Sequence, residues 1–503
     1  MTPPIGVDRH ESIRLMGDGP LDLLVAGGGI VGAGIVRDAA MRGLRVGLVE
    51  QHDFAFGTSS RSSRLLHGGL RYLAQGRVGL VREAGHEKLT VGRIAPHLAA
   101  PLAFVLPTYR GAPWAPWALW KLRIGVKMYD WLCGGRNFGD SSGLDPRQTA
   151  ALLPGINPEG LTGAVRYFDG FTNDARLVLD TLRSAAKAGG LVANYCRLEE
   201  AREEAGGWRC VLRDRVTGRA VEASARCVVN ATGPWGLQFP PGGIALRLTK
   251  GVHVVVDRTR LPVPDAVVLT VGKRILFAIP WGERVILGTT DTDYDGPLDD
   301  VRTDADDVRY ILRAVNDAFP AARLVEADVI ADWAGLRPLI ATPGGGPSDV
   351  SRSHEIRMSR PGWFDMAGGK LTTYRLMAEQ AVDRIEERLG RAYAPCTTAE
   401  TPLLDPSETK GVSGIVPPEI SPGVVEHGCR NEWAVHLDDV MRRRTGWRFY
   451  HRDAGEVAER VAGWMGGVLG WSAAERKAEL ERYRRHGGAA AACPGVDAVP
   501  VRS

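Results

Sequence analysis

The sequence predicts an α/β protein with a parallel sheet, a second sheet that is antiparallel, and a small helical domain near the C-terminal end. Three observations predict these parts. Residues 21–50 have the order strand, glycine turn, helix and strand, the unit from which parallel sheets are built. Residues 247–293 alternate between apolar and polar side chains like antiparallel strands, and residues 430–486 have helical periodicity.

The composition is that of an ordinary globular protein of 503 residues, with 44% hydrophobic and 24% charged residues. It excludes intrinsic disorder, collagen and a disulfide scaffold. No stretch approaches the roughly 18 apolar residues of a membrane-spanning helix, so we expect none. The net charge of +4 is too small for a dedicated nucleic-acid binder, but it suits a small anionic substrate or an anionic lipid surface.

The seven cysteines are scattered and include no C-x-x-C pair, a pattern typical of reduced thiols rather than of a zinc or other metal site. Residues 1–20 lack the apolar core of a secretory signal. We therefore expect a cytoplasmic protein, either free or on the inner face of the cytoplasmic membrane.

A glycine loop follows the first strand, Leu23–Ala26, and has the spacing Gly27-x-Gly29-x-x-Gly32. The first glycine permits a tight turn, the second lets the backbone approach a pyrophosphate, and the third lets helix and strand pack closely. The helix N-terminus adds unpaired N–H groups and a positive dipole end. Glu50 ends the second strand, where an acid accepts hydrogen bonds from ribose hydroxyls. These features predict a Rossmann-like domain that binds a dinucleotide.

Two distant segments, 228–235 and 363–373, each consist of a short apolar strand and a tight turn of small residues. We expect both to return to the sheet that residues 21–50 begin. Because a nicotinamide-binding domain is usually one contiguous block, the interruption favours a flavin dinucleotide. A helix that starts after Lys370 would place its N-terminus against the N1–C2=O edge of the flavin and stabilise the reduced ring. The alternative is two ordinary strand–turn junctions.

Several sequence blocks together carry a family resemblance. They are TSSRSSRLLHGGLRYL at 58–73, NATGPW at 230–235, KGVH at 250–253, GTTD at 288–291, GLRPL at 335–339 and GGKLTTYR at 368–375. From about Leu21 to Leu403, and again from Glu426 to Tyr450, the chain resembles the FAD-dependent glycerol-3-phosphate dehydrogenases. The one departure is the stretch between Leu403 and Glu426, which is shorter and richer in proline than in the family.

The resemblance implies a fold and an activity. It implies an FAD-binding domain of the glutathione-reductase/D-amino-acid-oxidase type. It also implies oxidation of sn-glycerol 3-phosphate to dihydroxyacetone phosphate by hydride transfer to flavin N5, with electrons passed to a quinone. The alternatives are an oxidase that reduces O₂ to hydrogen peroxide, an amine or amino-acid oxidase, and a flavin-binding redox sensor without turnover. A homodimer and a peripheral membrane contact stay open because the C-terminal region departs from the family.

The same blocks set the expected domain boundaries. We expect a discontinuous FAD-binding domain at 21–110, 160–250 and 355–400, and a substrate-binding domain at 111–159 and 251–354. A linker and C-terminal helical cap should occupy 401–486, with tails at 1–20 and 487–503.

The residues expected to contact FAD come from segments that are far apart in the sequence. The serine-rich loop after Glu50 offers hydroxyl and N–H groups to the pyrophosphate and the ribityl chain, and a generic polar loop is the alternative. The full set expected to bind the cofactor is Gly27, Gly28, Gly29, Gly32, Glu50, Thr58, Ser59, Ser60, Ser62, Ser63, His67, Gly68, Gly69, Ala231, Thr232, Gly233, Trp235, Gly369, Lys370, Leu371 and Thr372.

The reaction requires that the protein bind a phosphate dianion. Arginine binds phosphate bidentately, and lysine binds it as a point charge. Arg337 stands between apolar residues, where a solvated charge would be out of place. Arg352 fits the position of a second substrate arginine in the family. The expected substrate-binding set is Arg71, Arg337, Arg352 and Lys370. For each cation the alternative is a surface salt bridge.

The C2 hydroxyl also needs a proton acceptor, and histidine, with an ordinary pKa of about 6.5, suits this role at neutral pH. The Gly68-Gly69 pair after His67 favours a loop that approaches the ligand closely. His253 is the competing base, and a buried structural histidine is its alternative. The expected catalytic set is His67, Arg71, His253 and Lys370, with one of the two histidines as the base.

Aromatic and basic residues interleave between 114 and 131. Trp114, Trp117, Trp120, Tyr129 and Trp131 alternate with Lys121, Arg123 and Lys127. This combination suits a membrane interface, with the rings at the level of the headgroups and the cations on anionic lipid. It suits a domain core equally well if the charges extend outward to water.

Overall fold

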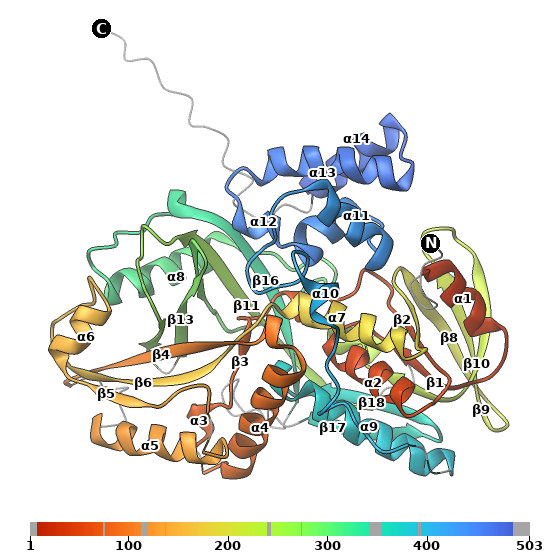
Figure 1. Ribbon diagram of the computed structural model, residues 1–503, viewed down its shortest axis with the longest axis horizontal. Coiled ribbons are helices and arrows are strands. Elements are labelled where there is room, and N and C mark those ends of the chain that lie inside the picture. Colours follow the sequence, from red (N-terminus) through yellow and green to blue (C-terminus); the bar gives the residue numbers. More distant parts are fainter. Residues whose placement is uncertain are drawn as a thin grey trace, which may run out of the picture.

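The computed structural model describes residues 8–73, 76–111, 119–135, 137–238, 243–272, 274–341, 354–390, 392 and 394–485. Figure 1 shows two sheet-based halves side by side, with the C-terminal helices above them. The parallel sheet lies in the right-hand half and the second sheet in the left-hand half. The predicted α/β architecture with two sheets and a helical C-terminal region is thus confirmed.

The first sheet has eight strands in the order β17-β18-β10-β1-β2-β7, with β9 beside β10 and β8 beside β9. The strands are β1 Leu21–Ala26, β2 Val46–Val49, β7 Leu191–Ala193, β8 Cys196–Glu204, β9 Gly207–Asp214, β10 Ala220–Asn230, β17 His354–Arg360 and β18 Trp363–Gly368. β18, β10, β1, β2 and β7 run parallel. Because β10 pairs with β1 and β18 pairs with β10, the expected return of both distant segments to this sheet is confirmed.

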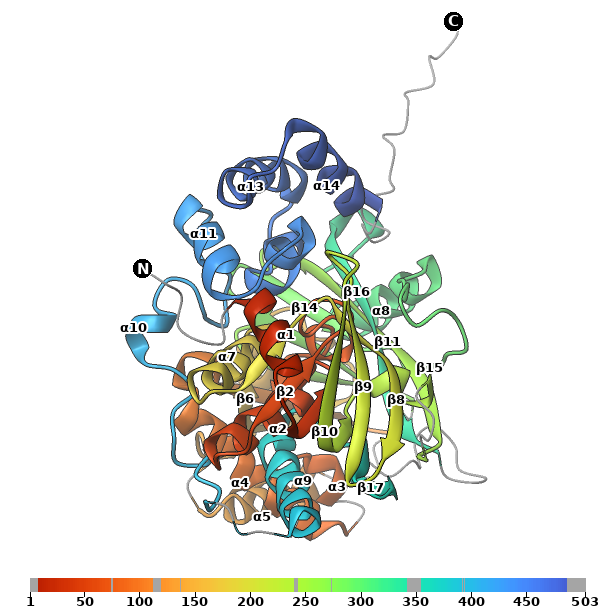
Figure 2. The ribbon, with the colours of Figure 1, turned by 90° about the vertical axis from the view of Figure 1, so that its right-hand side faces the viewer.

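Both faces of the parallel strands are buried, which explains their continuous apolar sequences. Leu23 and Val25 face the core formed with the helices α2 (Ile30–Met41), α7 (Asp174–Lys187) and α9 (Tyr374–Leu389). Leu24 and Ala26, which point the other way, face α1 (Arg9–Gly17) and the β8–β9 pair. Figure 2 shows α2, α7 and α9 on one side of these strands and the β8–β9 pair on the other.

The second sheet has ten strands in the order β15-β11-β14-β13-β12-β4-β6-β3, with β16 beside β11 and β5 beside β6. The strands are β3 Leu65–Leu66, β4 Ala100–Tyr109, β5 Ser142–Leu144, β6 Leu161–Phe171, β11 Leu246–Asp257, β12 Ala266–Val271, β13 Arg274–Trp281, β14 Arg284–Gly288, β15 Thr292–Asp293 and β16 Val329–Ile340. Helix α8 (Ala305–Ala318) begins at a capping box of Asp304 and Asp307 and packs on this sheet.

Strands β4 and β6 correct the expected domain boundaries. Both fall within ranges expected for the FAD-binding domain, 21–110 and 160–250, yet they pair with each other in the second sheet. The expected ranges are therefore too long. An apolar, alternating sequence predicts a strand, but the choice of sheet depends on partners that are distant in the chain.

Further helices surround the sheets. They are α3 Leu70–Leu73, α4 Val78–Ile94, α5 Leu119–Leu132, α6 Pro146–Leu152 and α10 Pro406–Thr409. α4 and α5 both contact β6, and α3 contacts both of them. This group of elements surrounds the segment that carries His67.

The C-terminal cap, residues 422–485, is helical as predicted. It contains α11 Pro422–Asn431, the π-helical turn Asp439–Arg444, α12 Trp447–Tyr450, α13 Ala454–Leu469 and α14 Ala473–Arg485. Two buried ionic contacts dock it on the half that contains the parallel sheet. Asp53, fully buried, accepts hydrogen bonds from Arg443 and Arg444, and Arg176 donates to Glu432 at 2.6 and 2.7 Å.

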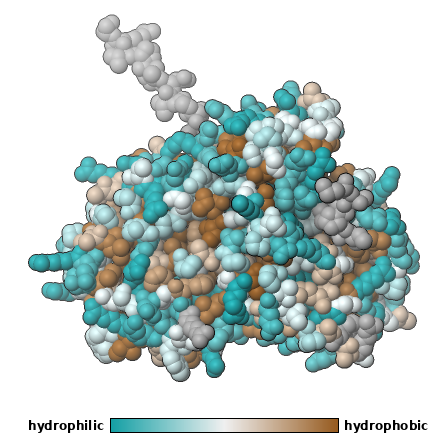
Figure 3. All heavy atoms as spheres, viewed as in Figure 1, coloured by the Kyte–Doolittle hydropathy of each residue, from teal (hydrophilic) through white to brown (hydrophobic). Residues whose placement is uncertain are grey.

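In the part of the chain that the structure describes, we find no helix with the length and apolar character needed to cross a bilayer. On the face shown in Figure 3, hydrophilic residues cover much of the surface, and hydrophobic residues gather near the middle, where the two halves meet.

Candidate active site

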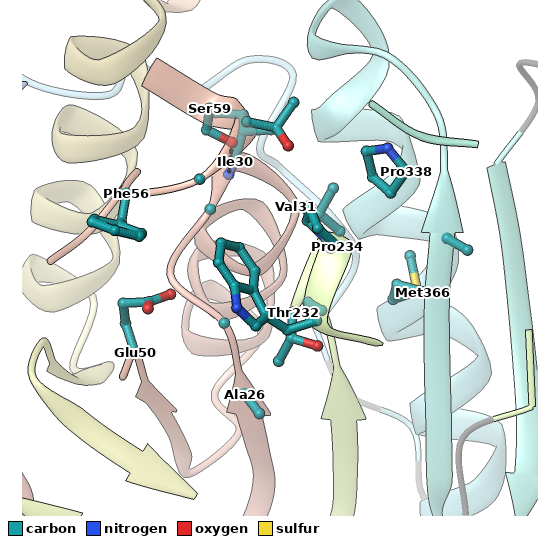
Figure 4. A pocket seen from close by; sticks show the side chains of 18 of the residues that line it. Ala26, Ile30, Val31, Glu50, Phe56, Ser59, Thr232, Pro234, Pro338 and Met366 are labelled. Carbon is teal, nitrogen blue, oxygen red and sulfur yellow. Dashed lines mark hydrogen bonds between the residues drawn. The ribbon is translucent and has the colours of Figure 1, made fainter. Parts of the chain in front are cut away.

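A cavity of about 280 Å³ lies at the carboxyl ends of the parallel strands β1, β2, β10 and β18. Ligands of open α/β sheets bind at this edge. Figure 4 shows Glu50 and Phe56 on one side of the cavity, Met366 and Pro338 on the other, and Thr232 and Pro234 between them.

At Gly27 the glycine loop lies against the turn that follows β10, without room for a side chain. Gly27 has φ +114°, and a Cβ atom there would lie 2.5 Å from the Ala231 carbonyl oxygen. A Cβ on Gly32 would lie 1.9 Å from the Gly27 carbonyl oxygen, so α2 packs on the turn as a dinucleotide loop requires. The Ile30 N–H at the start of α2 donates to Ser59 Oγ at 3.0 Å, which joins the serine-rich loop to the helix N-terminus.

Glu50 follows β2 at the cavity wall. Its carboxylate accepts hydrogen bonds from the backbone N–H groups of Gly28 (2.7 Å) and His52 (2.8 Å). Burial raises the pKa of Glu50 to about 7, and these two donors oppose the rise. The acid is thus fixed in orientation and titrates near neutral pH, where hydroxyl donors from a ribose would favour its ionised form.

The opposite end of the cavity is formed where α9 begins. The last strand ends in Gly368-Gly369, and Lys370 precedes the 3₁₀ turn Leu371–Thr373 that leads into the helix. Lys370 Nζ lies 4.1 Å from the centroid of the Tyr72 ring, a cation–π contact. A Cβ on Gly69 would lie 3.2 Å from the same nitrogen.

The segment His67-Gly68-Gly69, hereafter the His67–Gly69 loop, therefore lies beside Lys370. The His67 N–H donates to Thr372 Oγ1 at 3.0 Å, which ties the loop to the start of the last helix. α3 begins only at Leu70, so His67 and Arg71 do not share a helix. The structure thus has the loop that the two glycines predict.

His253 lies in β11 and is 2% exposed. Its Nε2 atom is 2.8 Å from Ser63 Oγ, and its ring stacks on Trp333 with centroids 5.2 Å apart. Burial, then the positive charges of Arg337 and Arg64, lower the pKa of His253 to about 3. The imidazole is therefore neutral across the physiological pH range.

Arg337 lies in β16 and crosses the neighbouring strand at Gly251, where a Cβ would lie 2.4 Å from its guanidinium. The guanidinium donates to Thr289 Oγ1 (2.9 Å) and Asp291 Oδ1 (3.1 Å). It lines the same cavity as Lys370. Two predicted phosphate-binding cations thus share one cavity.

Arg64, which the sequence analysis did not single out, stands outside the cavity lining and close enough to His253 for its charge to act on that imidazole. Its side chain is buried (the residue is 3% exposed), lies over the Trp281 ring at 4.3 Å, and pairs with Asp174 at 3.8 Å. Its Nε and Nη1 atoms have no hydrogen-bond partner among the described residues. The available signal was a basic residue directly before the apolar pair Leu65-Leu66, inside the longest family block.

The predicted site residues differ in where they stand relative to the cavity. Gly27, Gly29, Glu50, Thr58, Ser59, Ser62, Ala231, Thr232, Gly233, Trp235, Arg337, Gly369, Lys370 and Leu371 line the cavity. Gly28, Gly32, Ser63, His67, Gly68, Gly69, His253 and Thr372 stand behind that wall or beside it, and Ser60 lines a smaller cavity under the C-terminal cap. Arg352 lies outside the described residues, as does the side chain of Arg71. Cys196, Arg197 and Leu198, beside Glu50, also line the cavity and were not predicted.

These residues fit FAD. The Gly27 and Gly32 backbone leaves a cradle that any Cβ would fill, the α2 N-terminus faces it, and Glu50 stands where a ribose binds. At the other end, the turn before α9 supplies a helix N-terminus for the flavin edge.

Comparisons with known proteins agree with this fit. The chain matches the family described as FAD dependent oxidoreductase over residues 22–375, and the C-terminal domain of alpha-glycerophosphate oxidase over residues 417–476. Aerobic glycerol-3-phosphate dehydrogenase of Staphylococcus aureus (strain USA300) is 40% identical over 392 residues, which cover 75% of this chain and 70% of that protein.

Solved structures extend the likeness. Glycerol-3-phosphate dehydrogenase from Bacillus halodurans, complexed with FAD, is 30% identical and superposes with a TM-score of 0.77 over 96% of this chain and 97% of that one. The L-alpha-glycerophosphate oxidase of Mycoplasma pneumoniae, 16% identical with a TM-score of 0.59 over 75% of this chain and 96% of that one, shares the fold. Since the likeness includes both the cofactor half and the C-terminal cap, the chain belongs to the family of FAD-dependent glycerol-3-phosphate dehydrogenases.

Proposed function

We propose that this chain oxidises sn-glycerol 3-phosphate to dihydroxyacetone phosphate with FAD bound in the cavity. The supporting observation is that Arg337 and Lys370 line the same cavity, with the His67–Gly69 loop beside Lys370 and His253 near Arg337. FAD, when bound, supplies the acceptor for the hydride that leaves C2. The protein then has three tasks: to bind a phosphate dianion, to orient C2 and to remove the hydroxyl proton.

Arg337 and Lys370 are proposed to bind the phosphate. Arg337 is already oriented by Thr289 and Asp291, so a bidentate contact costs little further ordering of its side chain. Lys370 is a point charge at the start of the last helix, where the helix N-terminus also favours an anion. Arg71 and Arg352 are proposed as further phosphate ligands on the strength of the family resemblance alone.

We favour His67 over His253 as the base. His67 is half-buried in the loop beside Lys370, whereas the Nδ1 atom of His253 is buried and its Nε2 atom faces Ser63. A pKa of about 3 also makes His253 a weak proton acceptor at neutral pH. His253 is then proposed to support Arg337 and the substrate end of the cavity rather than to take the proton.

Anaerobic titration tests this function. The FAD-loaded protein should lose its flavin absorbance on addition of sn-glycerol 3-phosphate and keep it with glycerol, which lacks the phosphate. Bleaching by glycine would instead support an amino-acid oxidase. Bleaching by dithionite alone would support a redox sensor without turnover.

We further propose that α5 docks on an anionic membrane surface and that the electrons pass to a quinone. Trp120, Ile124, Met128 and Trp131 are 60%, 60%, 42% and 73% exposed, and their spacing puts them on one helix face. Lys121, Arg123 and Lys127 are exposed beside them. Tyr129 is an exception to the predicted interface, because it is fully buried. Trp114 and Trp117 lie outside the described residues.

Vesicle binding measures this contact. Vesicles rich in phosphatidylglycerol should bind the protein at low salt and release it as salt rises, and Trp120→Ser with Trp131→Ser should abolish binding. Absence of binding at low salt would contradict the proposal.

Reoxidation by a soluble quinone analogue faster than by O₂ would support the dehydrogenase over the oxidase. A homodimer stays a prediction from the resemblance, to be measured by sedimentation.

A further inference from the structure

The His67–Gly69 loop is supported from behind by a chain of buried polar groups. The Gly68 N–H donates to the Tyr129 hydroxyl at 2.9 Å and, more weakly, to Asp169 Oδ1 at 3.3 Å. Tyr129 comes from α5, Asp169 from β6 and Lys88 from α4. Tyr129 and Lys88 are fully buried, and Asp169 is 2% exposed.

In these hydrogen bonds Tyr129 and Lys88 both donate to Asp169, and Tyr129 accepts from Gly68. The Tyr129 hydroxyl donates to Asp169 Oδ1. Lys88 Nζ donates to the same oxygen at 2.8 Å and to Asn137 Oδ1 at 2.7 Å. Burial, then the Asp169 charge, raise the pKa of Tyr129 well above its ordinary value, so the phenol keeps its proton. With that proton given to Asp169, the phenol oxygen is left to accept from Gly68.

The other side of the loop faces the proposed chemistry. His67 N–H donates to Thr372, and Gly69, with φ +81°, lies against Lys370 Nζ and the Tyr72 ring. Only glycine fits at position 68, because a Cβ there would lie 2.4 Å from the Tyr129 oxygen. The peptide that follows His67 is therefore held between Tyr129 and the start of the last helix.

A purely structural ion pair would account for Lys88 and Asp169, but not for the hydrogen bond between Tyr129 and the Gly68 N–H. Buried ion pairs add little net stability compared with apolar packing, so a structural role alone gives no reason for these groups. Here the hydrogen bonds converge on the backbone N–H between His67 and Gly69, and an apolar side chain could not accept from it.

We propose that Tyr129 is a positioning residue for the reaction: its hydroxyl, oriented by Asp169 and Lys88, fixes the Gly68 peptide and so sets the place of the His67 imidazole relative to Lys370. The proposal rests on the proposed function for its kinetic consequence. Its structural consequence, a fixed Gly68 peptide, can be measured without turnover.

The test variant is Tyr129→Phe, which removes one oxygen and leaves the ring, Lys88 and Asp169 in place. Lys88→Met is unsuitable because it leaves a buried carboxylate uncompensated and endangers the fold. Tyr167→Phe is the matched control: its ring lies 6.0 Å from that of Tyr129, and its hydroxyl takes no part in the Gly68 hydrogen bonds.

Two measurements on FAD-loaded protein are needed. Hydrogen exchange of a peptide covering 65–73 should be faster in Tyr129→Phe than in wild type and unchanged in Tyr167→Phe. Flavin reduction by sn-glycerol 3-phosphate, followed in single turnover, should slow by about 10- to 100-fold in Tyr129→Phe, with KM and FAD content near wild type.

Each outcome decides the proposal. Unchanged exchange, a wild-type reduction rate, or equal losses in both variants would overturn it. A loss of FAD from Tyr129→Phe would also overturn it, since the network would then serve cofactor binding. If wild type itself is not reduced by the substrate, the proposed function fails, and the exchange data still decide whether Tyr129 fixes the loop.

Discussion

Two glycine-containing loops lie at the cavity, one lining it at Gly27 and Gly29 and the other beside Lys370, and a buried ionic group stands behind each. Behind the glycine loop, Asp53 binds Arg443 and Arg444 of the C-terminal cap, and the Phe54 ring packs edge-on against Trp433. Behind the His67–Gly69 loop, Asp169 binds Lys88 and Tyr129. The first support comes from residues almost four hundred positions away in the chain, and the second from α4, α5 and β6.

The difference in position indicates that the two supports affect different properties of the site. Phe54 lies against Gly28, where a Cβ would come within 2.6 Å of its ring, so the C-terminal cap reaches the glycine loop indirectly, through the contact of Trp433 with Phe54. The second group ends on the peptide beside His67. We therefore expect changes in the first support to affect cofactor retention and changes around the second to affect the reaction.

The largest expected effect is that of Asp53→Asn. It leaves Arg443 and Arg444 buried without their shared carboxylate, a change that costs about 3–5 kcal/mol. The free energy of unfolding, measured by urea denaturation of the FAD-loaded protein, should fall by this amount, and FAD should be lost first. Asp18→Asn, in an exposed pair with Arg14, should change it by less than about 0.5 kcal/mol. Equal effects of the two changes would contradict the comparison.

Arg337→Met should impair the reaction without affecting cofactor retention. The loss of a charged, oriented phosphate ligand should lower kcat/KM for sn-glycerol 3-phosphate by about 10²- to 10³-fold, while FAD content stays that of wild type. Arg247→Met, a change in an exposed pair with Asp293, is the control. A wild-type kcat/KM for Arg337→Met would remove Arg337 from the substrate site.

Glu50→Gln should weaken FAD binding by about tenfold, measured by flavin fluorescence. Because ribose hydroxyls favour the ionised acid, FAD affinity of wild type should rise as the pH rises through about 7, the pKa of Glu50. The variant should show no such rise. A pH dependence that survives in Glu50→Gln would assign it to another group.

The last effect, confined to acid pH, concerns His253. In the unfolded chain its imidazole binds a proton below a pH of about 6.5, whereas the folded one does so only near its pKa of about 3. The unfolded state therefore binds more protons between these values, and stability falls as the pH falls, by at most about 1.4 kcal/mol per pH unit. His253→Gln should lose that part of the slope in urea denaturation. An unchanged slope would contradict the buried, neutral imidazole.

The sequence was informative where function depends on local geometry. The glycine spacing predicted the turn at Gly27 because only that backbone fits against the turn that follows β10, and Gly68-Gly69 predicted the loop beside Lys370. Contacts between distant elements could not be predicted in this way. Periodicity did not assign β4 and β6 to their sheet, and the Asp53–Arg444 pair has no local signal. The aromatic residues between 114 and 131 suited a membrane interface and a domain core equally, and the sequence did not separate the buried Tyr129, which contacts Gly68, from the exposed Trp120 and Trp131.

The most direct measurement of the account is the rate of flavin reduction by sn-glycerol 3-phosphate in His67→Asn, followed anaerobically in a single turnover at full FAD occupancy. We expect the rate to fall by about 10²- to 10⁴-fold, the usual contribution of a general base, with His253→Asn affected less. A wild-type rate in His67→Asn would show that the proton leaves by another route and that the His67–Gly69 loop is not the reacting end of the cavity.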